Sequence, residues 1–347
     1  IRRVMRDTKR RNFFRFWKRS KFTDVAFRRD KEAIIDKFQG AGKRDAEIVR
    51  DSVFIIDEKN LGVHIFVDPG ETYFFGDIEW IGNSKYTSGF LDTVLGIKRG
   101  DVFNKALLET RLFQSMDGRD ISALYMDRGY LFFQVNPVEK SIVDNHINYE
   151  MRIMEGQEAR IKNVIIKGNH KTNEHVIRRE IRTRPGDLFN RNDIIRSQRE
   201  LAQLGYFDEQ NFDIIPIPNP QDGTVDIEYH LTERSSDQIE LSGGYGAGII
   251  IGTLGLSFNN FSIQNFFNKE SWQPLPTGDG QRLALRAQTN GRFFQSYNLS
   301  FTEPWLGGRK PNALTYWANH TQLGNNFRKS DPGYQGVSIT VTGIGIQ

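Results

Sequence analysis

Two stretches of the sequence, Ile78-Glu79-Trp80-Ile81-Gly82-Asn83 and Val164-Ile165-Ile166-Lys167-Gly168-Asn169, lie 86 positions apart and end on the same Gly-Asn pair. Each is a short apolar run that stops at a turn signal, which is typical of a strand that ends in a tight turn. A fixed period in a sequence identifies the structural unit that the chain repeats. The two stretches predict that one supersecondary unit occurs at least twice.

Other segments recur at the same offset. Gly100-Asp101-Val102-Phe103-Asn104 returns as Gly186-Asp187-Leu188-Phe189-Asn190, and Gly70 aligns with Gly156. A helical apolar pattern follows each Gly-Asn turn, and the Asn that ends the five-residue motif suits the N-cap of a second helix. Two strand-like segments then close each unit, so each unit is predicted to be β-α-α-β-β.

The second helix ends at Gly129-Tyr130 in the first copy and at Gly205-Tyr206 in the second copy, with ten more residues in the first. An earlier unit is present in part, because Lys31–Phe38 has a helical pattern and Val63–Val67 has the pattern of a closing strand. We therefore expect a partial repeat over 1–70, complete repeats over 71–156 and 157–235, and a different domain over 236–347.

The last third of the chain alternates between apolar and polar residues with a period of two. One face is apolar or aromatic and the other carries Arg, Gln, Asn, Ser and Thr, which is typical of a transmembrane β-barrel with lipid outside and a polar lumen. About 110 residues are too few for a complete barrel. We expect the first strands of a barrel whose remaining strands follow Gln347. The six alternating segments are 239–245, 253–258, 282–288, 296–302, 314–318 and 337–346.

Composition narrows the function. The hydrophobic share is 38%, and no stretch approaches the roughly 18 consecutive apolar residues of a spanning helix, so a helical transporter is excluded. The absence of cysteine excludes thiolate catalysis, Cys-ligated zinc and disulfides, but leaves the compartment open. The chain opens with Ile1-Arg2-Arg3 and no export signal, so the protein is either cytosolic or has a signal that is removed or upstream.

The start of the chain is basic although the formal net charge is only +4. Aromatic residues interleave with the basic ones, so this segment could bind nucleic acid or a membrane surface, but an amphipathic helix with a solvated basic face is the simpler interpretation. The basic residues are Arg2, Arg3, Arg6, Lys9, Arg10, Arg11, Arg15, Lys18, Arg19 and Lys21.

Catalytic chemistry has no support in the sequence. The histidines lack metal-ligand spacing, so we expect no metal site, and each is interpreted as structural or solvated. Gly244–Gly248 superficially suggests a phosphate loop, but Ile249–Gly252 continues as a strand where such a loop needs a helix N-terminus. We predict no enzyme activity and no cofactor. The histidines are His64, His146, His170, His175, His230 and His320.

Together these motifs resemble POTRA repeats followed by a surface-antigen-type β-barrel, the architecture of outer-membrane protein assembly factors. The resemblance rests on the repeated Gly-Asn, Gly-Asp-x-Phe-Asn and Gly-Tyr anchors and on several further segments. These segments are Val176–Glu180, Arg196-Ser197, Leu204–Phe207, Thr232-Glu233, Gly244–Gly246, Asn260-Phe261 and Thr302–Trp305.

The resemblance implies a barrel in a Gram-negative outer membrane with its POTRA repeats in the periplasm. It implies that the repeats receive unfolded outer-membrane proteins and that the protein works with accessory lipoproteins such as a BamD-like subunit. Outer-membrane lipid is then a partner and nucleic acid is not. The sequence does not explain why the first repeat is incomplete.

Two kinds of strand are candidate client sites. An open sheet edge can add an extended client strand through main-chain hydrogen bonds, and we expect such edges in 132–138 and 212–217, with Phe133, Val135, Phe212 and Ile214. The first barrel strand is rich in glycine, which weakens packing at its seam, so we expect it to open and template client strands. The seam residues are Ile239, Leu241, Gly243, Gly244, Tyr245, Gly246 and Gly248.

Two alternatives stay open. A two-partner-secretion-type or related translocation pore would pass a client outward, although such pores carry fewer repeats. A soluble basic protein that binds nucleic acid or cell wall would use the aromatic and basic start, but the six alternating segments argue against it.

Overall fold

The computed structural model describes residues 3–5, 7–8, 22–57, 60–115, 118–246, 249–272, 274–291, 293–308, 310–325, 327 and 330–347. The chain divides into two compact units, residues 1–159 with 188–191 and residues 160–187 with 192–347. Each is described by itself. Most of the basic segment at the start, Arg2, Arg6 and 9–21, lies outside the described residues, as does the seam residue Gly248.

The first unit opens with the predicted helix and closing strand. Helix α1 (Asp24–Gln39) begins at Thr23, whose hydroxyl accepts a hydrogen bond from the Ala26 N–H at 3.2 Å. Strands β1 (Glu47–Asp57) and β2 (Asn60–Asp68) follow as an antiparallel pair. This part therefore holds the helix and the two closing strands of a repeat, and the two strands form a sheet of their own.

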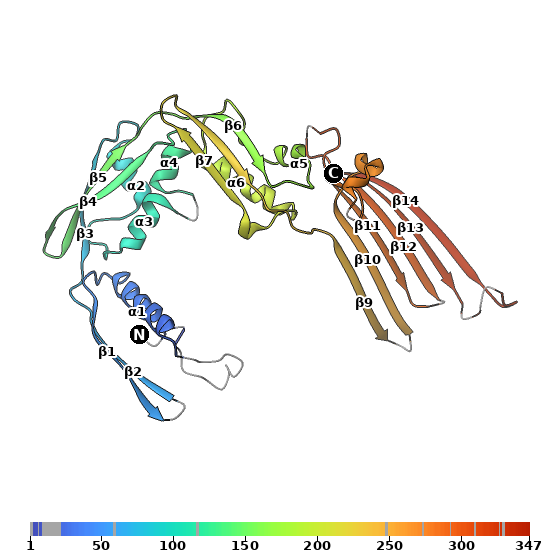
Figure 1. The fold of residues 1–347 in the computed structure, drawn as a ribbon, viewed down its shortest axis with the longest axis horizontal. Coiled ribbons are helices and arrows are strands. Elements are labelled where there is room, and N and C mark those ends of the chain that lie inside the picture. Colours follow the sequence, from blue (N-terminus) through green and yellow to red (C-terminus); the bar gives the residue numbers. More distant parts are fainter. Residues whose placement is uncertain are drawn as a thin grey trace. The chain divides into compact units, whose positions relative to one another are not determined.

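A complete repeat follows, and its strands form one sheet in the order β3-β5-β4. The first strand pairs with the last in parallel, and the last two strands pair antiparallel. In Figure 1 the helices of this repeat lie beside its strands. The elements are β3 (Phe74–Ile81), α2 (Ser88–Leu95), α3 (Lys105–Phe113), α4 (Ile121–Met126), β4 (Gln134–Val143) and β5 (His146–Met154).

The prediction of two helices was wrong for this copy, which has three. The extra ten residues split the second helix into α3 and α4, and Asp120 begins the new helix. Its fully buried carboxylate accepts hydrogen bonds from the Ala123 and Ser115 N–H groups and pairs with the Arg191 guanidinium at 3.0 Å. A buried carboxylate needs such partners, because an uncompensated charge in the core is costly.

The second complete repeat has the same sheet order, β6-β8-β7, with the same parallel and antiparallel pairings. Here two helices are present, as predicted. The elements are β6 (Arg160–Lys167), α5 (Glu174–Arg178), α6 (Arg191–Gln203), β7 (Asp213–Asn219) and β8 (Thr224–His230), with a short 3-10 helix at Glu209–Asn211.

Both repeats bury one face of the sheet under the helices. Along β5 every second residue is buried, and Leu91 of α2, Leu112 of α3 and Tyr125 of α4 are fully buried against that face. Along β8 the same alternation buries Val225, Ile227 and Tyr229. A sheet covered on one face and solvated on the other gives this pattern, so the core of each repeat lies between its helices and one sheet face.

The Gly-Asp-x-Phe-Asn motif has a backbone role that sequence reasoning missed. The Phe75 N–H donates to the Asp101 carbonyl at 2.8 Å, and the Gly100 N–H donates to the Phe75 carbonyl at 2.8 Å. The motif thus covers the outer edge of β3 at its start, and its counterpart covers β6. The equivalent bonds run from Ile161 N–H to Asp187 O and from Gly186 N–H to Ile161 O, 86 positions later.

The end of the motif contacts the helix end of the preceding repeat unit, within the first compact unit. The Tyr73 N–H donates to the Gly42 carbonyl at 2.8 Å and the Asn104 amide donates to the Gly40 carbonyl at 3.3 Å. The counterparts one repeat later are the bonds from Ala159 N–H to Gly129 O at 2.8 Å and from the Asn190 amide to Asp127 O at 3.1 Å. Sequence analysis assigned Asn104 only a capping role, which it also has, since it accepts from the Leu107 N–H.

The last third of the chain forms one antiparallel sheet of six strands in sequence order, β9 to β14. Figure 1 shows these strands side by side. All six predicted segments are strands. They are β9 (Gln238–Gly246), β10 (Ile249–Phe261), β11 (Thr277–Thr289), β12 (Phe294–Glu303), β13 (Leu314–Gly324) and β14 (Gly336–Ile346), with 3-10 helices at Gln264–Phe267 and Lys269–Ser271.

Among the helices in the described ranges, none combines the length and the apolar character of a membrane span.

Candidate functional site

The two predicted client-binding segments lie at sheet edges. Among the described strands, β4 and β7 are each hydrogen-bonded to one neighbour, β5 and β8 respectively. The candidate residues themselves differ in exposure: Phe133, Val135 and Phe212 are buried in the cores, and Ile214 is half-buried. An added strand would therefore meet the backbone of these edges and not those aromatic side chains.

Prolines make the two edges unequal. Proline has no N–H and fits a ladder only where its nitrogen faces away from the paired strand. Pro216 and Pro218 pair with Ile227 and Val225 and so mark the outward-facing positions of β7. Two outward donors are thus missing from a seven-residue strand, which makes β7 a poor template for strand addition.

The edge of β4 is less interrupted. Pro137 is its one proline, and Val135 and Glu139 on either side share its orientation because the strand period is two. Beyond a register shift after Glu139, the strand continues to Val143 with Ile142 and Val143 exposed. β4 is therefore the better of the two candidate edges.

Strand β9 forms one edge of the six-stranded sheet and pairs only with β10 over the described residues. Ile239 and Leu241 are 78% and 82% exposed, and Tyr245 is equally open. Gly243 and Gly244 lie in the middle of the strand, and Gly246 is its last residue. The predicted seam residues within the described ranges thus lie on the first strand of the sheet, and Ile239, Leu241 and Tyr245 have little side-chain packing.

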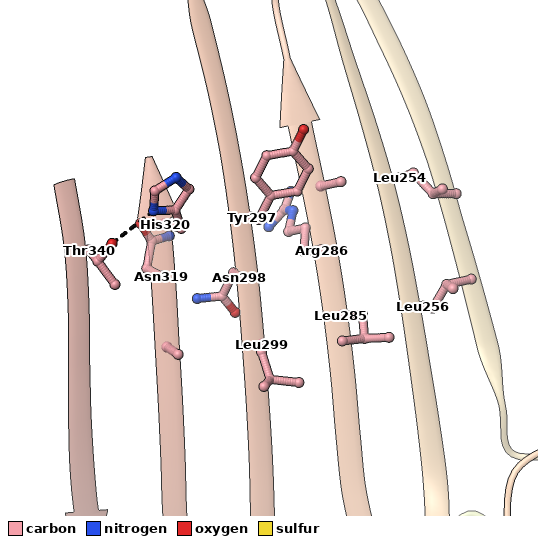
Figure 2. A pocket seen from close by; sticks show the side chains of 12 residues that line it. Leu254, Leu256, Leu285, Arg286, Tyr297, Asn298, Leu299, Asn319, His320 and Thr340 are labelled. Carbon is pink, nitrogen blue, oxygen red and sulfur yellow. Dashed lines mark hydrogen bonds between the residues drawn. The ribbon is translucent and has the colours of Figure 1, made fainter. Parts of the chain in front are cut away.

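Over β9 to β12 the sheet has one apolar and one polar face, and in part of β14 the order is reversed, with Thr340 in an apolar row and Val341 on the polar face. Register places Leu241, Leu254, Ala287 and Tyr297 in one row across four strands on the apolar face. On this face a hollow of about 380 Å³ opens, lined by four leucines and two alanines together with six residues that carry polar groups, among them Tyr297 and His320. Figure 2 shows Leu254, Leu256, Leu285 and Leu299 from neighbouring strands around it, with His320 hydrogen-bonded to Thr340.

On the polar face an ion pair reaches from the edge strand across its neighbour. The Arg286 guanidinium lies 3.4 Å from the Glu240 carboxylate, and both residues flank Gly255 of β10 in the ladder. Because Gly255 has no side chain, the two charged side chains can meet above it. This pair ties β9 to β11.

A group of buried polar residues lies where the second complete repeat meets the sheet, inside the second compact unit. The Asn173 amide donates to the Asp279 carboxylate at 2.7 Å, and the Asn173 N–H donates to the Gly278 carbonyl at 2.9 Å. The Asn260 amide donates to the Thr172 hydroxyl at 2.9 Å. Ser262 also donates to Asp279. These bonds satisfy polar groups that would otherwise be costly to bury.

Trp305 joins the same region from the end of β12. Its indole N–H donates to the Glu180 carboxylate at 2.9 Å, and the Arg179 guanidinium lies over its ring at 5.5 Å. Burial raises the pKa of Glu180, while Arg179 and Trp305 act in the opposite direction. The Tyr206 hydroxyl donates to the Gly280 carbonyl at 3.2 Å, and burial raises the pKa of Tyr206 to about 12.

In the described part of the chain, no group of three or more His, Cys, Asp or Glu residues is placed so that it could hold a metal ion. Histidines take part in hydrogen bonds and ion pairs of the sheets, as His230 does with Glu228 at 2.7 Å. His175 lies 3.7 Å from the Asp279 carboxylate.

Comparison with known proteins assigns the repeats. Residues 73–156 and 159–234 match the POTRA family, described as surface antigen variable number repeat. The sequence resemblance to POTRA repeats is thereby confirmed for these two segments, and the repeated anchors explain why it was visible in the sequence. The structure adds the expected antiparallel sheet after them.

The chain as a whole is similar to BamA-type assembly factors. It is 26% identical over 334 residues to the outer membrane protein assembly factor BamA of Neisseria meningitidis, covering 94% of this chain and 38% of the relative. The chain spans about a third of the length of the curated relatives it matches. These relatives are named as assembly factors, so the whole protein's activity is argued below as a proposal.

Solved structures show the same fold. BamA from Haemophilus ducreyi lacking POTRA domains 1–3 aligns with a TM-score of 0.58 and 22% identity, over 77% of this chain and 47% of that one. BamA POTRA3–5 from Haemophilus influenzae aligns with a TM-score of 0.50 and 24% identity, over 62% of this chain and 83% of that one. Both support the order of POTRA repeats and, in the first case, a following barrel sheet.

Proposed function

We propose that this chain is the part of an outer-membrane protein assembly factor that receives unfolded β-barrel clients and starts their insertion. The observation that supports this most is the direct passage from two POTRA repeats into an antiparallel sheet whose strands β9 to β12 have one apolar and one polar face. Such a sheet can face lipid on one side and water on the other. The similarity to BamA-type relatives supports the same role.

In this proposal β9–β14 cross the outer membrane and the POTRA repeats lie in the periplasm. The apolar face, with the hollow bordered by Leu254, Leu285 and Leu299, contacts outer-membrane lipid. The polar face, with Glu240, Arg286 and Asn298, lines the lumen. Segregation of this kind is expected because unpaired polar groups in the hydrocarbon region are costly.

Clients are held first at the β4 edge of the first complete repeat. Main-chain hydrogen bonds give affinity with little demand on the client's sequence, which suits a factor that handles many barrel proteins. The exposed Ile142 and Val143 at the end of β4 offer apolar contact. β7 contributes less, because Pro216 and Pro218 remove outward donors.

Insertion then proceeds at β9. Once its seam with the closing strand opens, its main chain can donate and accept hydrogen bonds with a client strand, and its glycines keep packing across the seam weak. The client sheet grows by adding strands at this edge. The chain performs no covalent chemistry in this scheme, and no cofactor is needed.

Partners follow from the same scheme. Unfolded outer-membrane proteins are the clients, and accessory lipoproteins, such as a BamD-like subunit, bind the periplasmic repeats. The similarity to assembly factors does not favour a secretion-type translocation pore or a soluble basic nucleic-acid or cell-wall protein.

The test is to place the full-length protein in proteoliposomes and to measure folding of an unfolded outer-membrane barrel protein. We expect faster folding than with empty liposomes. If the protein enters the bilayer without accelerating the client, the assembly role is wrong, and passage of the client across the bilayer would indicate a translocation pore.

A further inference from the structure

A long loop connects β10 to β11 at the end of the sheet that contacts the last POTRA repeat. This β10–β11 loop spans residues 262–276, is described except for Gln273, and contains the 3-10 helices Gln264–Phe267 and Lys269–Ser271. Figure 1 shows these two short helices in orange. Both β10 and β11 have a hydrogen-bonded neighbour on each side, so the loop lies within the sheet and not at its margin.

The loop leaves the sheet on the apolar face. A register shift after Asn259 places Phe261 opposite Gln281 of β11. Gln281 lies on the same face as Leu283, because the strand period is two. Phe261 lies on that face as well, and its ring is 6.2 Å from the ring of Phe301, the partner of Leu283 on β12. The loop therefore starts beside the apolar rows of β10–β12.

Large apolar side chains of the loop are exposed. Phe267 is 93% exposed, Ile263 is 57% exposed, and Phe266 and Trp272 are 49% and 39% exposed. The Phe266 ring contacts both other aromatic rings, with centroid distances of 5.5 Å to Phe267 and 5.6 Å to Trp272. A contiguous exposed apolar cluster of this kind marks an interaction site.

Polar groups of the loop are satisfied within the loop. The backbone N–H groups of Phe266, Asn268, Ser271 and Trp272 each donate to a carbonyl of the same loop. The indole N–H of Trp272 donates to the Phe266 carbonyl at 3.2 Å. Because unpaired backbone groups are costly away from water, this internal pairing lowers the cost of moving the loop into a lipid surface.

Charged residues sit between the aromatic ones. Lys269 and Glu270 are exposed and separate Phe267 from Trp272 along the chain. A lysine next to apolar groups can keep its ammonium in the headgroup layer while its aliphatic stem and the neighbouring rings contact acyl chains. This combination, continuous with the apolar face of the sheet, fits a lipid leaflet better than the surface of another protein.

We propose that the β10–β11 loop lies in the periplasmic leaflet of the membrane, with Phe267 between the headgroups and the upper acyl chains. This inference rests on the proposed function, because that function places the apolar face of the sheet in lipid. The loop extends the lipid contact beyond the strands, at the end of the sheet where the last repeat is held.

The contact can be tested with a fluorophore on a single cysteine, because residues 1–347 contain none. The full-length protein without other cysteines carries the probe at Phe267→Cys in bilayers with doxyl-labelled phospholipids. The doxyl quencher lies either near the headgroup end or near the methyl end of the acyl chain. We expect quenching of this probe, and more from the quencher near the headgroup.

Two reference positions calibrate the quenching. Leu285→Cys, on the apolar face of β11, is the lipid-facing reference and should be quenched by the deeper label as well. Ile217→Cys, an exposed position of β7 in the last repeat, is the aqueous reference and should not be quenched.

A second set of variants tests whether the Phe267 ring holds the loop at the lipid. The probe is placed at Glu270→Cys, and Phe267→Ser is added. Because the Phe267 side chain is almost fully exposed, its removal leaves the core of the sheet intact. We expect Phe267→Ser to reduce quenching of this probe. Gln264→Ser, at an exposed polar position of the same short helix, is the matched control and should leave quenching unchanged.

Quenching at Leu285→Cys without quenching at Phe267→Cys would overturn the lipid contact of the loop and leave the sheet in the membrane. Shielding of that unquenched probe from aqueous iodide would then indicate a protein partner. Quenching at Phe267→Cys alone would support the loop contact and count against the proposed function. Absence of quenching at both positions would overturn both, and unchanged quenching in the Phe267→Ser variant would contradict the role of the ring.

Discussion

Single residues explain why the repeats could be recognised in the sequence. Gly82 and Gly168 have φ near +90°, and a Cβ at either would collide with a backbone carbonyl of the closing strand, Ile153 or Leu231. The following Asn closes the turn, since the Asn83 amide donates to the Tyr86 carbonyl. Glycine is thus required at both positions for two reasons, the positive φ and the lack of space for a Cβ.

These two requirements can be separated within one repeat. Gly186 has φ of +94° but open space around its Cβ position, whereas Gly168 has both the positive φ and the collision. Alanine at a left-handed position costs about 1–2 kcal/mol, and forced overpacking adds about 1–3 kcal/mol. We expect Gly168→Ala to lower the unfolding free energy more than Gly186→Ala, as measured by denaturant unfolding. Equal losses would mean that the close approach to Leu231 contributes nothing.

Tyr206 carries a pH dependence at the alkaline end. Its pKa is raised by burial from 10.0 to about 12, so the folded state holds the phenol proton more tightly than the unfolded state. The stabilisation is complete below pH 10 and is lost as pH rises through about 12, up to about 3 kcal/mol for a shift of two pKa units. The difference in tyrosinate absorbance between the parent and Tyr206→Phe should titrate near pH 12. Titration of the difference near pH 10 would contradict the burial argument.

At the level of elements, the sequence predicted most strands and helices because each has a clear period. It missed the division of one helix into α3 and α4, since an insertion within a helical pattern does not by itself show where Asp120 will begin a new helix. It also missed that Gly-Asp-x-Phe-Asn covers the edges of β3 and β6. That role depends on backbone pairing between segments more than twenty residues apart, which no local pattern contains.

The two POTRA edges lead to a prediction for client contact. With a photo-crosslinking residue at Ile142 beside the β4 edge or at Ile217 in β7, both exposed, we expect the Ile142 probe to capture more unfolded client. The double substitution Pro216→Ala and Pro218→Ala restores two outward N–H groups to β7 and should raise capture at Ile217. Pro137→Ala in β4 is the matched control and should leave capture at Ile217 unchanged. Greater capture at Ile217 than at Ile142 in the parent protein would contradict the assignment of β4.

On the scale of the whole molecule, the order of repeats and sheet was predictable, and the side-chain contacts between the last repeat and the sheet were not. Motifs such as Thr302–Trp305 and Val176–Glu180 were visible as marks of a resemblance, yet their meeting through Trp305 and Glu180 joins residues 125 positions apart. Long-range pairing is what the sequence pattern lacks.

The most direct test of the central claim, that clients grow on β9 when its seam opens, is a reversible lock of that seam. Ser242→Cys in β9 is combined with a cysteine in the strand that closes the full-length barrel, and client folding is measured in proteoliposomes before and after reduction. The account predicts little acceleration while the disulfide holds and full acceleration after reduction, with each single-cysteine variant active throughout. Full acceleration with the seam locked would contradict it.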